Sequence, residues 1–151
     1  MGHMMDGKWV DDDRITADTR GAFVRADSQF RSWITGAGPS GSAGFKAEPG
    51  RYHLFVSYNC PWAHRAIIFR KLKKLEDVIS MSLADKPKAH GWAYSEGIDD
   101  FRPEDDGIFR LHQVYAAADP KYTGKVTVPT LWDRERRTIV NNSSFLNGFW
   151  M

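Results

Sequence analysis

The fold is decided by residues 51–70, which read Arg51-Tyr-His-Leu-Phe-Val-Ser-Tyr-Asn-Cys60-Pro-Trp-Ala-His-Arg-Ala-Ile-Ile-Phe-Arg70. The run from Tyr52 to Ser57 is rich in aromatic and β-branched residues, which is typical of a strand. Pro61 is favoured at the first position of a helix, and apolar residues recur at helical spacing from Trp62 onward. This order predicts that Cys60 lies where a strand ends and a helix begins.

The predicted position of Cys60 at a helix N-terminus has a chemical consequence. Free backbone N–H groups and the positive end of the helix dipole favour the thiolate, and His64 and Arg65 add positive charge nearby. A lone cysteine is otherwise usually a small, buried and inert side chain. The strand–Cys-Pro–helix context favours a reactive thiol over this structural role, because a structural cysteine has no need of such a position.

The spacing around Cys60 also predicts the type of thiol chemistry. Dithiol redox proteins carry Cys-x-x-Cys, in which the second thiol resolves a mixed disulfide. That position is Ala63 here, and the chain contains no other cysteine. A disulfide at Cys60 must therefore form with an outside thiol and be resolved by another, and glutathione is the abundant small thiol of cells. The sequence favours a monothiol, glutathione-linked mechanism.

Length and composition exclude several other classes of protein. The chain has 151 residues, 42% of them hydrophobic, which suits one domain with an extension. Its 21 basic and 19 acidic residues form no basic stripe, which argues against nucleic-acid binding. One cysteine fits a reducing compartment, predicted to be the cytoplasm, and the five histidines lack ligand spacing, so no metal is expected. Neither a long apolar run nor a signal peptide stands out, so no membrane association is expected.

The chain divides by composition into two parts. Residues 1–44 are predicted to be an N-terminal extension and flexible linker, with Gly2-His3-Met4 resembling a vector-derived remnant outside the fold. Aromatic side chains in this extension, among them Trp9 and Phe30, could pin it to the main domain. Residues 45–151 are predicted to form the globular domain.

Within the globular part, the pattern predicts an α/β fold. Residues 78–83 form a second strand, parallel to the first, because strand, helix and strand follow at crossover spacing. Residues 84–110 have the composition of a loop, and Leu111 to Ala118 form a short helix. A hairpin follows, with its return strand at residues 138–140. This order is thioredoxin-like.

Two later segments leave alternatives open. A cis Val128–Pro129 bond could open a strand and leave the Val128 backbone free to pair with a ligand, or a trans proline could lie on an edge strand. Ser143 and Ser144 could begin a helix that holds a carboxylate, or could be plain helix caps. The final apolar residues, 145–151, suggest a chain that has been cut short.

Several of these motifs together resemble the N-terminal half of the glutathionyl-hydroquinone reductases, glutathione transferase-like enzymes related to the omega class. The similar stretches are Gly50-Arg-Tyr-His-Leu-Phe-Val-Ser-Tyr-Asn-Cys60-Pro-Trp-Ala-His-Arg65, Ala117-Ala-Asp-Pro120, Thr127-Val-Pro129, Leu131-Trp-Asp133 and Thr138-Ile-Val-Asn-Asn142. In the leader, Phe23, Ser28, Phe30, Arg31 and Trp33 match the family's pattern.

The resemblance implies a reaction and a site. Cys60 would attack the glutathionyl sulfur of a glutathionyl-hydroquinone, release the hydroquinone and form a mixed disulfide that a second glutathione resolves. Val128, before cis-Pro129, would pair with the cysteinyl part of glutathione, and Trp92 would contact the tripeptide. The Ser143–Ser144 region would bind the γ-glutamyl end. Glutathione is then a co-substrate, no metal is needed, and the full-length parent would form a homodimer.

Two departures from the family pattern qualify this expectation. The family has Glu-Ser-Ser after Val-Asn-Asn, whereas Asn142 is followed here by Ser143 and Ser144, so the Glu expected to hold the γ-glutamyl amine is missing. The family's C-terminal helical domain, which forms the hydroquinone pocket, is absent from this sequence, and low activity is therefore expected. The alternatives are an omega-like thiol transferase or dehydroascorbate reductase, and a non-catalytic glutathione-fold binding module.

Overall fold

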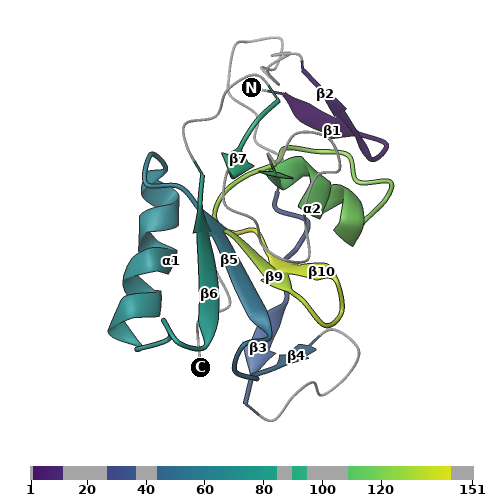
Figure 1. The fold of residues 1–151 in the computed structure, drawn as a ribbon. Helices are drawn as coiled ribbons and strands as arrows, with labels where there is room; N and C mark the ends of the chain where they lie inside the picture. Colours follow the sequence, from purple (N-terminus) through teal and green to yellow (C-terminus); the bar gives the residue numbers. More distant parts are fainter. Residues whose placement is uncertain (1, 12–26, 37–43, 85–89, 95–108, 144–151) are drawn as a thin grey trace.

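The structure, a computed structural model, describes residues 2–11, 27–36, 44–84, 90–94 and 109–143. Its centre is a four-stranded sheet in the order β10-β9-β5-β6 (Figure 1). Strands β5 (Tyr52–Val56) and β6 (Ile79–Leu83) are parallel, while β9 (Thr130–Asp133) is antiparallel to β5 and to β10 (Thr138–Asn141). This confirms the predicted parallel crossover, the hairpin and the thioredoxin-like α/β fold.

The two helices of the described ranges lie on opposite sides of this sheet, α1 beside β6 and α2 near β10 (Figure 1). Helix α1 (Pro61–Leu72) begins directly after Cys60, and α2 (Leu111–Ala118) has the predicted bounds. The buried residues of α1 are small, namely Ala63 and Ala66. Four large apolar side chains of α1 are exposed instead: Trp62, Ile68, Phe69 and Leu72.

The N-terminal segment forms part of the fold. Strands β1 (His3–Met5) and β2 (Lys8–Val10) make an antiparallel hairpin, and the Met4 side chain is buried in the core. It was therefore wrong to leave Gly2-His3-Met4 out of the fold, whatever the origin of these residues. Trp9 and Phe30 pack against the core, which confirms that aromatic side chains pin this segment to the domain.

Four further strands are short. Strands β3 (Trp33–Thr35) and β4 (Gly44–Lys46) pair in parallel, and β7 (Ala93–Tyr94) pairs with β8 (Phe109–Arg110) in antiparallel orientation. The prediction that residues 84–110 are loop throughout is thus wrong at both β7 and β8. Tyr94 and Phe109 pack on each other and on Phe55, so these two short strands close one side of the core.

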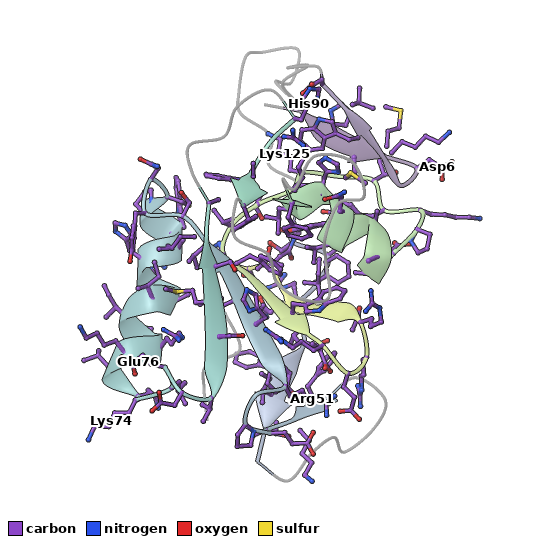
Figure 2. All side chains as sticks on the ribbon, in the orientation of Figure 1. Asp6, Arg51, Lys74, Glu76, His90 and Lys125 are labelled. Carbon is purple, nitrogen blue, oxygen red and sulfur yellow. The ribbon has the colours of Figure 1, made fainter. Side chains whose placement is uncertain are left out.

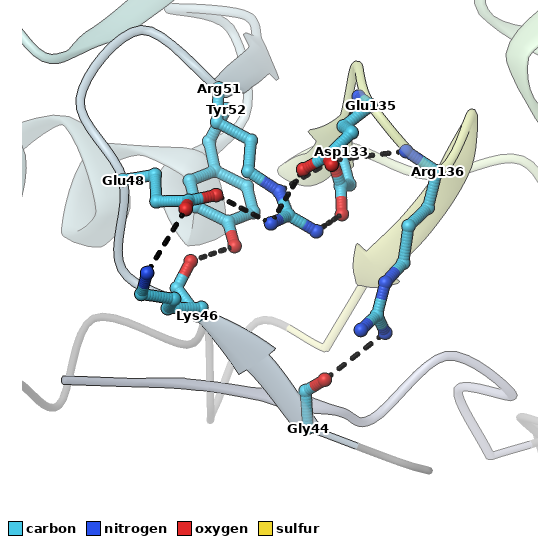
Figure 3. Close-up of polar contacts among 8 residues, drawn as sticks. All are labelled: Gly44, Lys46, Glu48, Arg51, Tyr52, Asp133, Glu135 and Arg136. Carbon is cyan, nitrogen blue, oxygen red and sulfur yellow. Dashed lines mark hydrogen bonds and ion pairs between the residues drawn. The ribbon is translucent and has the colours of Figure 1, made fainter. Parts of the chain in front are cut away.

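An ion-pair network fixes the start of β5 to the end of β9 (Figure 3). The Arg51 guanidinium donates to both carboxylate oxygens of the fully buried Asp133, at 3.0 and 2.6 Å. Glu48 and Glu135 each contact the same guanidinium at 2.7 Å. Hydrogen bonding to Asp133 raises the pKa of Arg51, and burial raises the pKa of Tyr52 to about 12. This network lies at the edge of the sheet away from Cys60.

Candidate functional site

Strand directions bring the candidate residues to one edge of the sheet. Cys60 follows the end of β5, and β9, which starts after Pro129, runs antiparallel to β5. The end of β10 meets the start of β9, so Ser143 reaches the same edge. Segments that are far apart in the sequence therefore converge at the N-terminus of α1.

Cys60 is the N-cap residue of α1, with extended backbone angles, and its side chain is half-buried. A turn precedes it, in which the Cys60 N–H donates to the Ser57 carbonyl at 3.1 Å. The Ser57 hydroxyl donates to the Ala84 carbonyl at 3.0 Å, which ties this turn to the end of β6. The Cys60 thiol itself lies 3.5 Å from the Val128 carbonyl oxygen. The predicted strand–Cys-Pro–helix arrangement is confirmed.

The Val128–Pro129 bond is cis, and β9 begins at the next residue. Of the two arrangements that the sequence allows, the structure has the one in which the proline opens the strand. Within the described part of the chain, the Val128 N–H makes no hydrogen bond. The Val128 carbonyl contacts the Cys60 thiol, and a backbone N–H of the same residue, without a partner in the described ranges, is suited to pair with an extended peptide-like ligand.

Tyr115 in α2 supports the segment around the Val128–Pro129 bond. The sequence did not indicate this role. The Tyr115 hydroxyl lies 3.2 Å from the Thr127 carbonyl oxygen and 3.0 Å from the Thr130 hydroxyl, on either side of the Val128–Pro129 bond. It also accepts a hydrogen bond from the Asn142 side-chain amide at 3.1 Å. One buried hydroxyl from α2 thus joins the segments before β9 and after β10. A tyrosine in an apolar helix gives no local signal for such a role.

Trp92 lies just before β7, and its carbonyl accepts a hydrogen bond from the Leu111 N–H at the start of α2, at 3.0 Å. The side chain is only 7% exposed, and its indole Nε1 has no hydrogen-bond partner among the residues that the structure describes. Because a buried N–H donor without a partner is costly, this donor is a candidate for a ligand contact.

The segment after β10 is also buried and polar. The Ser143 N–H donates to the Asn141 side-chain oxygen at 2.7 Å, so the start of this segment is fixed by a local turn. The Asn142 side-chain oxygen is buried and has no partner in the ranges that the structure covers. Ser144 and the predicted helix after it lie outside the described residues. The role predicted for the two serines therefore stays a prediction.

His64 lies in the first turn of α1, which follows Cys60. The His64 ring donates from Nε2 to the Tyr58 carbonyl at 2.9 Å, which holds the exposed ring at the start of the helix.

In the described ranges, neither helix has the length and apolar character needed to cross a bilayer. Those residues also contain no group of three or more His, Cys, Asp or Glu side chains suited to a metal ion.

Taken together, the geometry can support thiol chemistry on a peptide-like ligand. A single half-buried thiol lies at the N-terminus of α1, in contact with the Val128 carbonyl. Among the described residues, the Val128 N–H and two buried polar atoms, on Trp92 and Asn142, lack hydrogen-bond partners. With Ala63 in place of a second cysteine, a disulfide at this thiol needs an external partner.

Comparison with known proteins gives consistent matches. Residues 59–146 match the family described as Glutathione S-transferase, N-terminal domain. The chain is 46% identical over 146 residues to the glutathionyl-hydroquinone reductase PcpF of Sphingobium chlorophenolicum, covering 95% of this chain and 44% of that protein. It is 48% identical over 153 residues to the glutathionyl-hydroquinone reductase YqjG of Escherichia coli, covering 95% of this chain and 45% of that protein.

A solved structure agrees with these relatives. The glutathione-bound structure of YqjG, a glutathione transferase homolog from Escherichia coli K-12, superposes with a TM-score of 0.72 at 39% identity, covering 98% of this chain and 44% of that chain. The chain thus spans less than half the length of the curated relatives it matches.

Proposed function

Because the chain belongs to the glutathione S-transferase family, of which it carries the N-terminal domain, we propose that Cys60 transfers a glutathionyl group from a glutathionyl-hydroquinone to a second glutathione. The observation that carries this proposal is the position of Cys60 as the N-cap of α1, beside the Val128 backbone. The names of two relatives, the glutathionyl-hydroquinone reductases PcpF and YqjG, support the choice of substrate.

The reaction has two thiol steps. In the first, the Cys60 thiolate attacks the glutathionyl sulfur, the bond from sulfur to the aromatic carbon breaks, and that carbon takes a proton from water. The hydroquinone leaves and a Cys60–glutathione disulfide remains. In the second, the thiolate of another glutathione attacks the glutathionyl sulfur of this disulfide, which gives oxidised glutathione and regenerates the Cys60 thiolate. Over the whole cycle Cys60 is regenerated, so the two electrons that reduce the aromatic carbon come from the substrate's own glutathionyl sulfur and from the second glutathione, the two sulfurs joined in oxidised glutathione.

The surrounding groups have binding roles in this proposal. The Val128 backbone, held by cis-Pro129, pairs with the cysteinyl part of glutathione, and the Trp92 indole N–H donates to the tripeptide. Ser143 and Ser144 receive the γ-glutamyl end. Support comes from the unused Val128 N–H and from the partnerless Trp92 Nε1, both judged among the described residues. Ser143 stands where the resemblance leads one to expect a Glu, so affinity for the γ-glutamyl amine should be reduced.

The remaining features of the whole protein are part of the same proposal. Residues 1–44 act as an arm and residues 45–151 as the glutathione-binding domain. The hydroquinone pocket and a homodimer contact belong to the region that the relatives have beyond the matched half. A cytoplasmic location is proposed because glutathione is abundant there and a single free thiol stays reduced there.

The test is intact-mass spectrometry of this chain after mixing with a glutathionyl-hydroquinone, with Cys60→Ser as the control. A glutathione adduct on Cys60 that added glutathione removes would support both half-reactions. An adduct formed only from glutathione disulfide would favour the omega-like thiol transferase. No adduct from either donor, together with slow alkylation of Cys60 by iodoacetamide at neutral pH, would refute the catalytic role and favour a binding module.

A further inference from the structure

The β1–β2 hairpin docks on elements that carry the candidate glutathione site. Met4 and Gly124 exchange backbone hydrogen bonds of 2.8 and 2.9 Å, and the Gly7 N–H donates to the Tyr122 carbonyl at 3.0 Å. The hairpin turn needs a glycine here, since Gly7 has a φ of +73°. Residues 122–124 connect α2 to the segment before Val128, so the hairpin braces this connection.

Asp11, directly after β2, binds the turn that precedes Trp92. Its carboxylate accepts the His90 backbone N–H at 3.0 Å and contacts the His90 ring Nδ1 at 2.7 Å. The same carboxylate accepts the Trp9 indole N–H at 3.1 Å. The His90 backbone N–H is the main cause of a lowered pKa at Asp11. Figure 2 shows His90 beside the hairpin, at the end of the molecule opposite Arg51.

Trp9 packs against the His90–Gly91 turn and against α2. Its ring stacks on His112 in the first turn of α2, with centroids 4.9 Å apart and planes 19° from parallel. It also lies against Gly91, where an added Cβ would be 2.9 Å from the ring, so no larger residue fits without movement. His90 and Gly91 both have positive φ, +71° and +82°, which makes this turn one that the chain does not adopt easily on its own.

We propose that Asp11 and Trp9 are positioning residues for the glutathione site, which hold the His90–Gly91 turn so that the Trp92 indole keeps its place. The inference rests on the proposed function, because it assigns these residues a purpose only if Trp92 contacts glutathione. Trp92 is fixed from one side by its backbone bond to Leu111 in α2 and from the other by the turn that Asp11 holds. Asp11 lies 79 residues before His90, so nothing local in the sequence indicates this contact.

The test compares three variants of this chain by calorimetric titration with glutathione. Asp11→Ala removes all three contacts and should raise the glutathione dissociation constant at least about fivefold, the lower end of coupling between a remote residue and a binding site. Asp11→Asn keeps the oxygen that accepts the His90 and Trp9 N–H groups. Its glutathione dissociation constant should therefore lie close to that of the unaltered chain. Lys8→Ala, an exposed change on the same hairpin, should bind like the unaltered chain.

Two further measurements separate positioning from a general loss of structure. Amide hydrogen exchange in residues 90–94 should be faster in Asp11→Ala, while the rate of Cys60 alkylation by iodoacetamide should not change. If the unaltered chain binds glutathione and Asp11→Ala binds it equally well, the positioning role is refuted and the proposed function stands. If Asp11→Asn is as weak as Asp11→Ala, the proposed contact set is refuted. If the unaltered chain binds no glutathione, the proposed function fails and the positioning role fails with it.

Discussion

The Cys60 thiol lies 3.5 Å from the carbonyl oxygen of Val128, a residue 68 positions further along the chain. This contact joins the N-terminus of α1 to the start of β9, so the sulfur and the Val128 N–H lie in the same small region. A cysteinyl group bound to Cys60 through a disulfide would therefore lie beside a backbone that can pair with it. The chemistry of the thiol and the binding of its substrate depend on the same few contacts.

Ala63 is the residue that should decide between one-thiol and two-thiol chemistry. It is fully buried, and its N–H donates to the Cys60 carbonyl at 3.0 Å, so its side chain lies one turn from the thiol. We expect Ala63→Cys to resolve a Cys60–glutathione disulfide internally, which leaves a protein disulfide and no stable adduct in the intact mass. The larger buried side chain should cost about 1 kcal/mol or somewhat more in stability.

Ala66→Cys is the matched control for this change. It adds a buried cysteine to the same helix, but at 1.5 Å per residue it lies about 9 Å along the axis from Cys60. That exceeds the span of roughly 7 Å that a disulfide can bridge, so the adduct should persist. A stable adduct in Ala63→Cys as well would mean that the missing second cysteine does not determine the monothiol mechanism.

Tyr115→Phe should loosen the segments on both sides of Val128. The change removes the hydroxyl that contacts Thr127, Thr130 and Asn142 and leaves buried polar atoms without a partner. We expect the free energy of unfolding, measured with urea, to fall by about 1–3 kcal/mol, and glutathione binding to weaken. Tyr58→Phe is the control, because Tyr58 is exposed and its hydroxyl removal should cost less than about 0.5 kcal/mol. Equal stability of the two variants would contradict the role given to Tyr115.

Arg51→Met should be much more destabilising than the loss of an exposed partner of the same arginine. Asp133 is fully buried and would lose its charged partner, which typically costs about 3–5 kcal/mol. Glu135 contacts the same guanidinium but is 67% exposed, so Glu135→Gln should cost at most about 1 kcal/mol. Urea unfolding of both variants measures the difference. Similar losses in the two would show that burial of Asp133 is not what makes the network important.

The sequence predicted the elements that carry strong local patterns and missed those that depend on distant partners. Strand β5 and α1 were predicted because a run of aromatic and β-branched residues and a Cys-Pro boundary are local signals. Met4 gave no such signal, since its burial depends on pairing with Gly124, far along the chain. Strands β7 and β8 have two residues each, too few for alternation to appear.

The residues of the candidate site also fall into those that the sequence indicates and those that only the fold reveals. Cys60 was predicted from its neighbours, and Trp92 and Val128 from the family resemblance. Tyr115 and Asp11 were missed, because each acts through hydrogen bonds to residues brought close only by the fold.

His53 should make the stability of the domain fall in mild acid. The ring is buried between the Ser80 and Ser82 hydroxyls, at 2.7 and 3.1 Å. Burial, with a further contribution from Arg134, lowers its pKa to about 3, whereas an unfolded chain has the ordinary value of about 6.5. Between these values only the unfolded chain takes up the proton. The contribution is therefore complete above about pH 6.5 and is lost progressively as the pH falls toward 3.

His112 should also lower the free energy of unfolding in mild acid, because burial lowers its pKa to about 4. Its effect should be smaller than that of His53, because the His112 ring is only partly buried. The free energy of unfolding should thus fall between pH 6.5 and 5, by at most about 1.4 kcal/mol per pH unit for each histidine. Urea unfolding at pH 7, 6 and 5 measures the slope. His53→Gln should flatten it, and His64→Gln, which changes an exposed ring on α1, should not. A slope unchanged by His53→Gln would mean that the buried imidazole is not the group that titrates on unfolding.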